Sequence, residues 1–453
     1  MFALASILEA IFLRIAFLGD LRQHIAEAIG LLLLAGLFYL VCTFLVLRRR
    51  SPLSPAFVVA AAIVFRLTFW PLYPALSDDV FRYRWEGKLQ AAGGNPYEVR
   101  PNDAAWSSLR DETFASVPGR DFRAVYGPLV EEIEWMTYGL VSRFEARPFA
   151  QAFWFKVPSA LFDLGAMAAL WLLLKEKNIP RDRILIYAWS PLPLIEFWGT
   201  GHNDSIAIFF LLLALLQSRA RQRADLGAFA ALALATVSKF WPAILFPIFI
   251  GWRPRRWFLS LIAIPILALA TLPYFTSTVR WPGIDENLRF MSGFLGGWRN
   301  NDSLFGVLLW AAGNDFYLAK KFAFAIVCVA IVAVIALRWP PERSALAVIA
   351  VLLMVSANCH PWYLTWMLPL LVFYPAPPLL LWLTLAPLAH TAVIRWIAAG
   401  EWNGSTSIRY YEYVPVYLAL AIWLIARRVS SARASAAGGP LLRRPISTRS
   451  PLG

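Results

Sequence analysis

The chain of 453 residues is 59% hydrophobic and only 15% charged, and its mean hydropathy is +0.58. A soluble domain of this length carries far more polar residues, so the composition excludes that class and indicates an integral membrane protein surrounded by membrane lipids. In a soluble protein the net charge of +14 would suggest nucleic-acid binding. Here the basic residues form short clusters between apolar segments, and we predict no nucleic-acid partner.

The N-terminal segment, residues 1–23, is apolar over its first 19 residues but is interrupted by Glu9 and Arg14. No basic stretch precedes the apolar residues, so we do not interpret the segment as a cleaved signal peptide. We expect an interfacial helix here, with an additional membrane span as the alternative.

From residue 24 to residue 427, apolar segments alternate with polar connections that often contain proline or glycine. The candidate spans are 24–47, 55–74, 150–174, 184–200, 203–217, 226–239, 241–252, 256–274, 318–337, 344–357, 361–374, 378–395 and 410–427. Several are short, so we predict an all-α, polytopic transmembrane helix bundle of about 11–13 spans. Residues 428–453 end in a stretch rich in serine, proline and arginine and are expected to form a disordered cytoplasmic tail.

Basic clusters fall on alternate connections, a pattern that sets membrane orientation because positive loops stay in the cytoplasm. The clusters are Arg48–Arg50, Lys175–Arg183, Arg219–Arg223, Arg253–Arg256, Arg338–Arg343 and the tail from Arg427. The other connections then face outward: 75–149, 201–204, 275–317, 358–362 and 396–409. These outer loops are rich in Asp, Asn, His, Trp and Tyr, and two are long enough for short interfacial helices. We therefore predict a multi-pass protein of the cell (inner or plasma) membrane with its site on the extracytoplasmic face.

The first large outer loop, 75–149, opens with an acidic pair, Asp78 and Asp79, after Ser77. In one interpretation Ser77 caps a helix, the acids favour its N-terminus, and Arg82 pairs with Asp78 one turn away. In the other, a carboxylate at the membrane surface acts as a general base on a hydroxyl group. Asp79, Arg82 and Glu86 share one helical face, so a cation and carboxylates would meet one ligand. The residues alone leave both interpretations open.

Four charged residues lie within predicted spans, namely Arg66, Lys156, Asp163 and Glu196. Charges at membrane depth usually pair with one another. Arg66 and Asp163 fall at similar depth, as do Lys156 and Glu196 nearer the outer end. We expect two structural ion pairs.

The outer motifs together resemble a known family. They are Asp-Asp at 78–79, Arg-Tyr-Arg-Trp-Glu-Gly at 82–87, Gly-Asn-Pro-Tyr at 94–97, Gly-His-Asn-Asp at 201–204, Ser-Lys-Phe-Trp-Pro at 238–242 and His-Pro-Trp-Tyr at 360–363. This set, spread over residues 55–427, resembles the bacterial polyprenol-phosphate-sugar-dependent glycosyltransferases of the GT-C type. It is most similar to their integral-membrane mannosyltransferase-like branch.

The resemblance implies an inverting sugar transfer outside the cytoplasm. The donor would be a hexose, most plausibly mannose, on a polyprenyl phosphate, and the acceptor a lipid or glycan hydroxyl. The catalytic carboxylate of the family maps onto Asp78 or Asp79, and we favour Asp79 because it shares a face with Arg82 and Glu86. The resemblance brings no cofactor.

The phosphate that leaves with the lipid needs positive partners near the membrane surface. The candidate donor-phosphate residues are Lys239, Arg299 and Arg82. The candidate substrate-binding residues are Glu86, His202, Asn203, Asp204, His360, Trp362 and Tyr126, with Trp298 as a second tryptophan suited to stack on a sugar. The spacing of His202, Asp204 and His360 specifies no metal, so we predict no metal site.

A transporter or flippase of a lipid-linked sugar is the alternative function. Both functions need membrane spans and polar residues near the lipid headgroups. The enzyme is favoured because the polar residues are one-sided, an acidic pair lies at the surface, and no internal repeat of the transporter kind is evident.

Overall fold

The computed structural model describes residues 1–48, 53–218, 224–252, 254–276, 299–400 and 406–436. Within these residues the regular structure is helical, with one isolated parallel bridge between Asn300 and Asn358. This confirms the predicted all-α, polytopic helix bundle. In the part of the chain that the structure describes, six helical stretches are long and apolar enough to cross a membrane: Ile25–Leu47, Pro148–Glu176, Pro254–Tyr274, Phe316–Ala336, Pro377–Ala399 and Ser407–Ser430. Four shorter apolar helices accompany them: Pro55–Phe69, Asp204–Gln217, Asp225–Ser238 and Trp241–Gly251.

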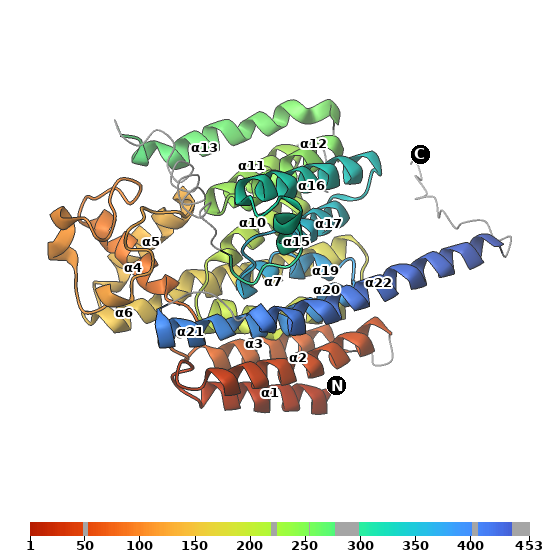
Figure 1. The fold of residues 1–453 in the computed structure, drawn as a ribbon, viewed down its shortest axis with the longest axis horizontal. Helices are drawn as coiled ribbons and strands as arrows, with labels where there is room; N and C mark the ends of the chain where they lie inside the picture. Colours follow the sequence, from red (N-terminus) through yellow and green to blue (C-terminus); the bar gives the residue numbers. More distant parts are fainter. Residues whose placement is uncertain (49–52, 219–223, 253, 277–298, 401–405, 437–453) are drawn as a thin grey trace, which may run out of the picture.

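The N-terminal helix α1 (Phe2–Ala16) lies beside α2 (Ile25–Leu47) and α3 (Pro55–Phe69) (Figure 1). The ring of Phe12 packs edge-on against Phe65 and Phe69, with ring centroids 5.1 and 5.3 Å apart. The chain start lies at the same end of the bundle as the end of α2 (Figure 1). The first segment is therefore a helix packed on the bundle, and whether it is interfacial or crosses the membrane stays a prediction.

The centre of the bundle is made of helices that prolines and glycines divide into short pieces. They are α7 (Lys156–Glu176), η3 (Arg181–Ile184), α8 (Leu185–Ala188), α9 (Pro191–Pro193), the π-helical η4 (Leu194–Gly199), α10 (Asp204–Gln217) and α11 (Ala224–Ser238). The predicted span 184–200 is therefore several short helices, because Pro191 and Pro193 lack the N–H groups that a continuous helix needs.

The C-terminal half completes the bundle. Its elements are η5 (Trp241–Leu245), α12 (Phe246–Trp252), η6 (Pro254–Ile262), α13 (Ala263–Thr271), η7 (Leu272–Tyr274), α15 (Leu304–Ala311), α16 (Phe316–Ala336), α17 (Pro341–Met354), α18 (Pro361–Leu364), α19 (Leu368–Leu371), α20 (Pro377–Leu385), η9 (Ala386–His390), α21 (Thr391–Ala399) and α22 (Thr406–Ala436). Helix α22 continues nine residues beyond the end expected at 427, and the rest of the predicted tail lies outside the described residues.

Residues 77–154 form a compact unit at one end of the bundle, which we call the loop end (Figure 1). Its helices are α4 (Asp79–Ala91), η1 (Ala104–Leu109), η2 (Phe114–Ser116), α5 (Pro128–Val141) and α6 (Pro148–Trp154). Helix α4 packs closely on α5 because a glycine stands at the contact: a Cβ on Gly87 would lie 2.4 Å from the carbonyl oxygen of Glu134. The first outer loop therefore carries short helices, as the sequence indicates.

One of the two predicted ion pairs within the spans is present. Arg66 Nε donates to Asp163 Oδ2 at 2.7 Å, and both side chains are fully buried. The other prediction is wrong: Lys156 Nζ donates to the carbonyl oxygens of Trp70 and Leu72, at 2.7 and 2.5 Å, and not to Glu196. The carbonyl groups at and just after the end of α3 have no helical hydrogen-bond partners, and Lys156 lies close enough to donate to them.

Candidate active site

The two adjacent aspartates at the start of α4 have different surroundings. Asp79 is the first residue of the helix, its N–H donates to Ser77 Oγ at 3.2 Å, and its side chain is 27% exposed. Asp78 is buried: Arg22 donates to its Oδ1, and Trp396 Nε1 donates to its Oδ2 at 3.1 Å. Burial raises the pKa of Asp78, and Arg22 opposes that effect. Of the pair, Asp79 is the carboxylate that can meet a substrate.

The predicted pair between Asp78 and Arg82 does not form. Arg82 Nε instead donates to Glu86 Oε1 at 2.5 Å, and its other nitrogens donate to the carbonyl oxygens of Gly119 and Phe122 at 2.8 and 3.0 Å. Asp78 prefers Arg22, a partner from a distant segment that sequence spacing does not show. Arg82 is buried and fastens the loop around Gly119, and its role in holding a phosphate stays a prediction.

The turn before α10 brings His202 to Asp79. Gly201 has a φ of +85°, and a Cβ there would lie 2.8 Å from Lys156 Cγ, so the turn requires glycine. The turn places His202 Nε2 3.7 Å from Asp79 Oδ2. Asn203 beside it is 5% exposed, and neither polar atom of its side chain has a hydrogen-bond partner among the described residues. A buried amide without partners costs free energy, so Asn203 is a candidate ligand contact.

Lys239 is held near the site by a buried aspartate. Its Nζ donates to Asp204 Oδ2 at 2.7 Å, and Trp366 Nε1 donates to Asp204 Oδ1 at 2.6 Å. Asp204 is fully buried and positions the lysine, and its predicted contact with substrate stays a prediction. The ammonium group remains partly exposed, with a 15% exposed side chain, and can donate further hydrogen bonds.

The Tyr-Gly-Pro motif of the first loop docks on the segment that carries Lys239. The N–H of Gly127 donates to the carbonyl oxygen of Ser238 at 3.3 Å. A Cβ on Gly127 would lie 2.1 Å from the carbonyl oxygen of Val237, so no larger residue fits. Tyr126 packs edge-on against Tyr83, a neighbour of Asp79 on α4, with ring centroids 5.2 Å apart. Burial raises the pKa of Tyr83 well above its ordinary value.

Two outer motifs that are far apart in sequence meet at the bridge between Asn300 and Asn358. Asn300 Nδ2 lies 2.8 Å from His360 Nδ1, and Trp362 stacks against both His360 and His202, with ring centroids 4.4 and 4.0 Å apart. Trp362 is 6% exposed. It therefore packs between motifs, and stacking on a sugar stays a prediction. Trp298 lies outside the described residues.

Arg299 belongs to a second cation cluster. Asp302 is bonded on Oδ2 by Arg299 and on Oδ1 by Arg409, which comes from α22. The side chains of Arg299 and Arg409 are 30% and 23% exposed, whereas Asp302 is 1% exposed. As with Lys239, a buried aspartate holds basic side chains that remain partly exposed.

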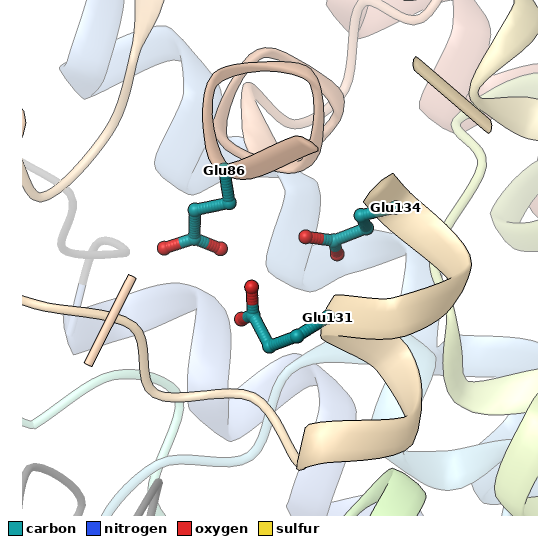
Figure 2. A group of neighbouring side chains, drawn as sticks. All are labelled: Glu86, Glu131 and Glu134. Atoms are coloured by element: carbon teal, nitrogen blue, oxygen red, sulfur yellow. The ribbon is translucent and has the colours of Figure 1, made fainter. Parts of the chain in front are cut away.

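Three buried glutamates lie close together in the loop end, a grouping that the sequence analysis did not predict. Figure 2 shows Glu86 from α4 and Glu131 and Glu134 from α5 pointing toward one another. One carboxylate oxygen from each lies within 4.8 Å of the others, a spacing that suits a divalent cation with oxygen ligands. Burial raises the pKa of all three, most for Glu131 and Glu134, while Arg82 opposes the shift. Burial therefore favours the protonated, neutral forms of these carboxyl groups. The role of Glu86 in substrate binding stays a prediction.

Replacing Glu134 with glutamine tests whether protons or a bound cation neutralise the three glutamates. A raised pKa means that the folded chain binds more protons than the unfolded chain above the ordinary value of 4.5, so stability falls as pH rises. Glutamine mimics the protonated form. We expect Glu134→Gln to match or exceed the wild-type melting temperature, with the larger gain at about pH 8 than at about pH 5.

Glu132→Gln is the matched control, because Glu132 is the neighbour on α5 and accepts from Tyr274 at 3.0 Å instead. Two results together would instead support a bound cation. At high pH, Glu134→Gln would melt at a lower temperature than the wild type, and chelator would lower the melting temperature of the wild type.

Several residues around the site gave no sequence signal. Arg22 and Trp396 hold Asp78, Arg409 shares Asp302, and His390 lies 3.0 Å from Glu196. All are contacts between segments far apart in the chain. The only available hint was that Trp396 and Arg409 border the same predicted outer connection, 396–409.

The chain was compared with models of known families, with curated proteins and with solved structures. Residues 5–256 match the model of the MptA_B family, described as alpha-(1->6)-mannopyranosyltransferase, N-terminal domain. The match covers more than half of the 453 residues and includes the elements that carry Asp79, His202 and Lys239. No curated protein and no solved structure matches the chain.

Proposed function

Because the chain belongs to the alpha-(1->6)-mannopyranosyltransferase N-terminal domain family, and is a membrane glycosyltransferase, we propose that it transfers mannose from a polyprenyl-phosphate donor to an acceptor hydroxyl. Asp79 acts as the general base, and the reaction takes place on the extracytoplasmic face. The family assignment also sets aside the transporter alternative, since the match is to a transferase.

The observation that carries the proposal is the contrast between the two aspartates. Asp78 has both oxygens bonded and is 8% exposed, whereas the side chain of Asp79 is 27% exposed and lies 3.7 Å from His202. A general base must reach the proton that it removes. Asp79 can reach an acceptor, and Asp78 cannot.

The cations support the leaving group. Departure of a lipid phosphate develops negative charge, which preorganised ammonium and guanidinium groups stabilise. Lys239, Arg299 and Arg409 are each fixed by a buried aspartate and each remain partly exposed. We propose that Lys239 and Arg299 hold the donor phosphate, with Arg409 beside Arg299.

The stereochemistry follows from the family description. An α linkage made with inversion requires a donor in which mannose is β-linked to phosphate. The (1->6) linkage in the family description further places the acceptor hydroxyl of the proposed reaction at position 6 of a sugar. Such a donor stays in the membrane, in line with the long apolar helices of the bundle.

The test is transfer by purified protein in detergent. Labelled mannose should move from polyprenyl-phosphate mannose to a mannoside acceptor without a second compartment, and a nucleotide-linked mannose should not serve as donor. Transfer from the nucleotide donor alone would refute the proposed donor, and binding of lipid-linked mannose without transfer would refute the proposed function.

The phosphate assignment predicts a kinetic signature. Lys239→Ala and Arg299→Ala are each expected to raise the KM for the lipid donor and leave the KM for the acceptor unchanged, because each removes a charge-assisted hydrogen bond to phosphate. Initial rates at varied donor and acceptor measure both constants.

Lys320→Ala provides a control for loss of a surface cation, since Lys320 lies on α16 over the ring of Phe316. Unchanged donor kinetics in both test variants, at normal membrane levels, would show that phosphate binds elsewhere.

A further inference from the structure

Four titratable side chains form a series of contacts that begins at Asp79 and leads into the buried core. His202 Nε2 lies 3.7 Å from Asp79 Oδ2, and Nδ1 of the same ring lies 2.9 Å from Glu196 Oε2. The other oxygen of Glu196, Oε1, lies 3.0 Å from His390 Nε2. The side chains of His202, Glu196 and His390 are at most 1% exposed.

The series joins three separate parts of the chain. Glu196 lies in the π-helical η4, and π-helical turns are rare and frequent at functional sites. His202 follows in the Gly201 turn, where its N–H donates to the carbonyl oxygen of Glu196 at 2.8 Å. His390 ends η9, nearly two hundred residues later. Stacking on Trp362 holds the ring of His202 from the side.

The carboxylate of Glu196 determines where the hydrogen of each imidazole sits. An ionised carboxylate accepts hydrogen bonds and donates none. His202 Nδ1 lies 2.9 Å from Glu196 Oε2 without forming an aligned hydrogen bond, and in the proposal that follows Nδ1 carries the hydrogen on this side, so that the lone pair of Nε2 faces Asp79. His390 likewise presents its Nε2–H to Glu196.

We propose that His202 receives the proton that Asp79 removes from the acceptor, and that Glu196 and His390 are positioning residues for His202. This inference rests on the proposed role of Asp79. As the acceptor oxygen bonds to the anomeric carbon, its O–H bond breaks and the proton goes to Asp79. The electron pair of the sugar–phosphate bond leaves with the phosphate. The proton then moves from Asp79 to His202 Nε2, which keeps Asp79 ionised while the product forms. When the product leaves, the proton returns through the partly exposed Asp79 to solvent, and both groups are reset for the next turnover.

Glu196 serves this second step in two ways. It keeps Nε2 free to accept, and its negative charge stabilises the imidazolium that forms, as an orienting carboxylate does beside a catalytic histidine. The distance of 3.7 Å exceeds a hydrogen bond, and catalytic hydrogen bonds often reach their working length only with substrate bound.

The neighbouring cations and bases do not compete for the proton. Across Trp362, burial and then His202 and Lys239 lower the pKa of His360 to about 3, so His360 stays neutral. Lys239 is already paired with Asp204. Among the described groups, His202 is the base that lies within 4 Å of Asp79.

Glu196→Gln is the decisive variant, because glutamine keeps the size of the side chain but removes its charge and no longer fixes the tautomer of His202. We expect kcat to fall by about tenfold or more while the KM for the lipid donor stays within about twofold. The pH profile of kcat should also differ from that of the wild type, because the variant removes the charge beside the ring of His202. His390→Gln should act in the same direction, and Glu196→Gln with His202→Gln should be no worse than His202→Gln alone.

Glu342→Gln is the matched control: Glu342 is 1% exposed and pairs with Lys177 at the start of α17, remote from the loop end. An unchanged kcat and pH profile in Glu196→Gln and His390→Gln, with only the melting temperature lowered, would overturn the inference and leave a structural network. The proposed function fails separately, if the wild type transfers no mannose or Asp79→Asn remains active.

Discussion

Asp79→Asn is expected to lower turnover by about a hundredfold to ten-thousandfold, the usual contribution of a general base. Asparagine keeps the shape of the side chain and the ability to begin α4, so membrane levels and donor binding should persist. The measurement is the initial rate of mannose transfer with purified protein, together with the donor Kd by a direct binding assay.

Asp78→Asn is the matched control on the neighbouring residue. It weakens the contacts of Asp78 with Arg22 and Trp396, which join the loop end to the N-terminal segment and α21. We therefore expect a lower melting temperature with turnover per folded molecule largely retained. Near-normal turnover in Asp79→Asn would remove the general base from this account.

Asp163→Ala is expected to have the largest effect on stability. Its carboxylate accepts from Arg66 at 2.7 Å, from Tyr187 at 2.7 Å and from Trp198 at 2.9 Å. Removing it leaves the fully buried Arg66 without its counter-charge, and breaking a buried pair in this way costs about 3–5 kcal/mol. The yield of monodisperse protein in detergent and its melting temperature measure the loss.

The double variant Arg66→Met with Asp163→Leu separates charge from packing. Replacing both ions of a buried pair with apolar residues of similar size is often neutral or stabilising. We expect it to recover most of the stability that Asp163→Ala loses. An Asp163→Ala protein as stable as the wild type would show that Arg66 finds another partner.

The sequence was sufficient for the features that depend on local pattern or depth. Apolar periodicity indicated the helical bundle, and the similar depths of Arg66 and Asp163 indicated their pair. It failed for Lys156, because a lysine beside a helix end is satisfied by carbonyl groups as readily as by Glu196, and spacing cannot distinguish the two.

The site was harder to predict because its contacts are between distant segments. The acidic pair at Asp78 and Asp79 could be predicted. The contact that gives the two residues different roles joins Asp78 to Arg22, 56 residues earlier in the chain. In the sequence, Glu131 and Glu134 look like exposed acidic residues of a loop helix. The close packing of α4 on α5 at Gly87 buries them beside Glu86. Asp204 looked like a ligand contact, and its burial under Lys239 and Trp366 requires the assembled fold.

The most direct test of the account is the anomeric configuration of the product. Purified protein is supplied with polyprenyl-phosphate mannose of defined β configuration and a mannoside acceptor, and the new linkage is determined by NMR. A single displacement with Asp79 as base predicts an α linkage, at position 6 if the family description extends to this chain. A β-linked product would mean net retention, and would contradict a mechanism in which the acceptor attacks the donor directly.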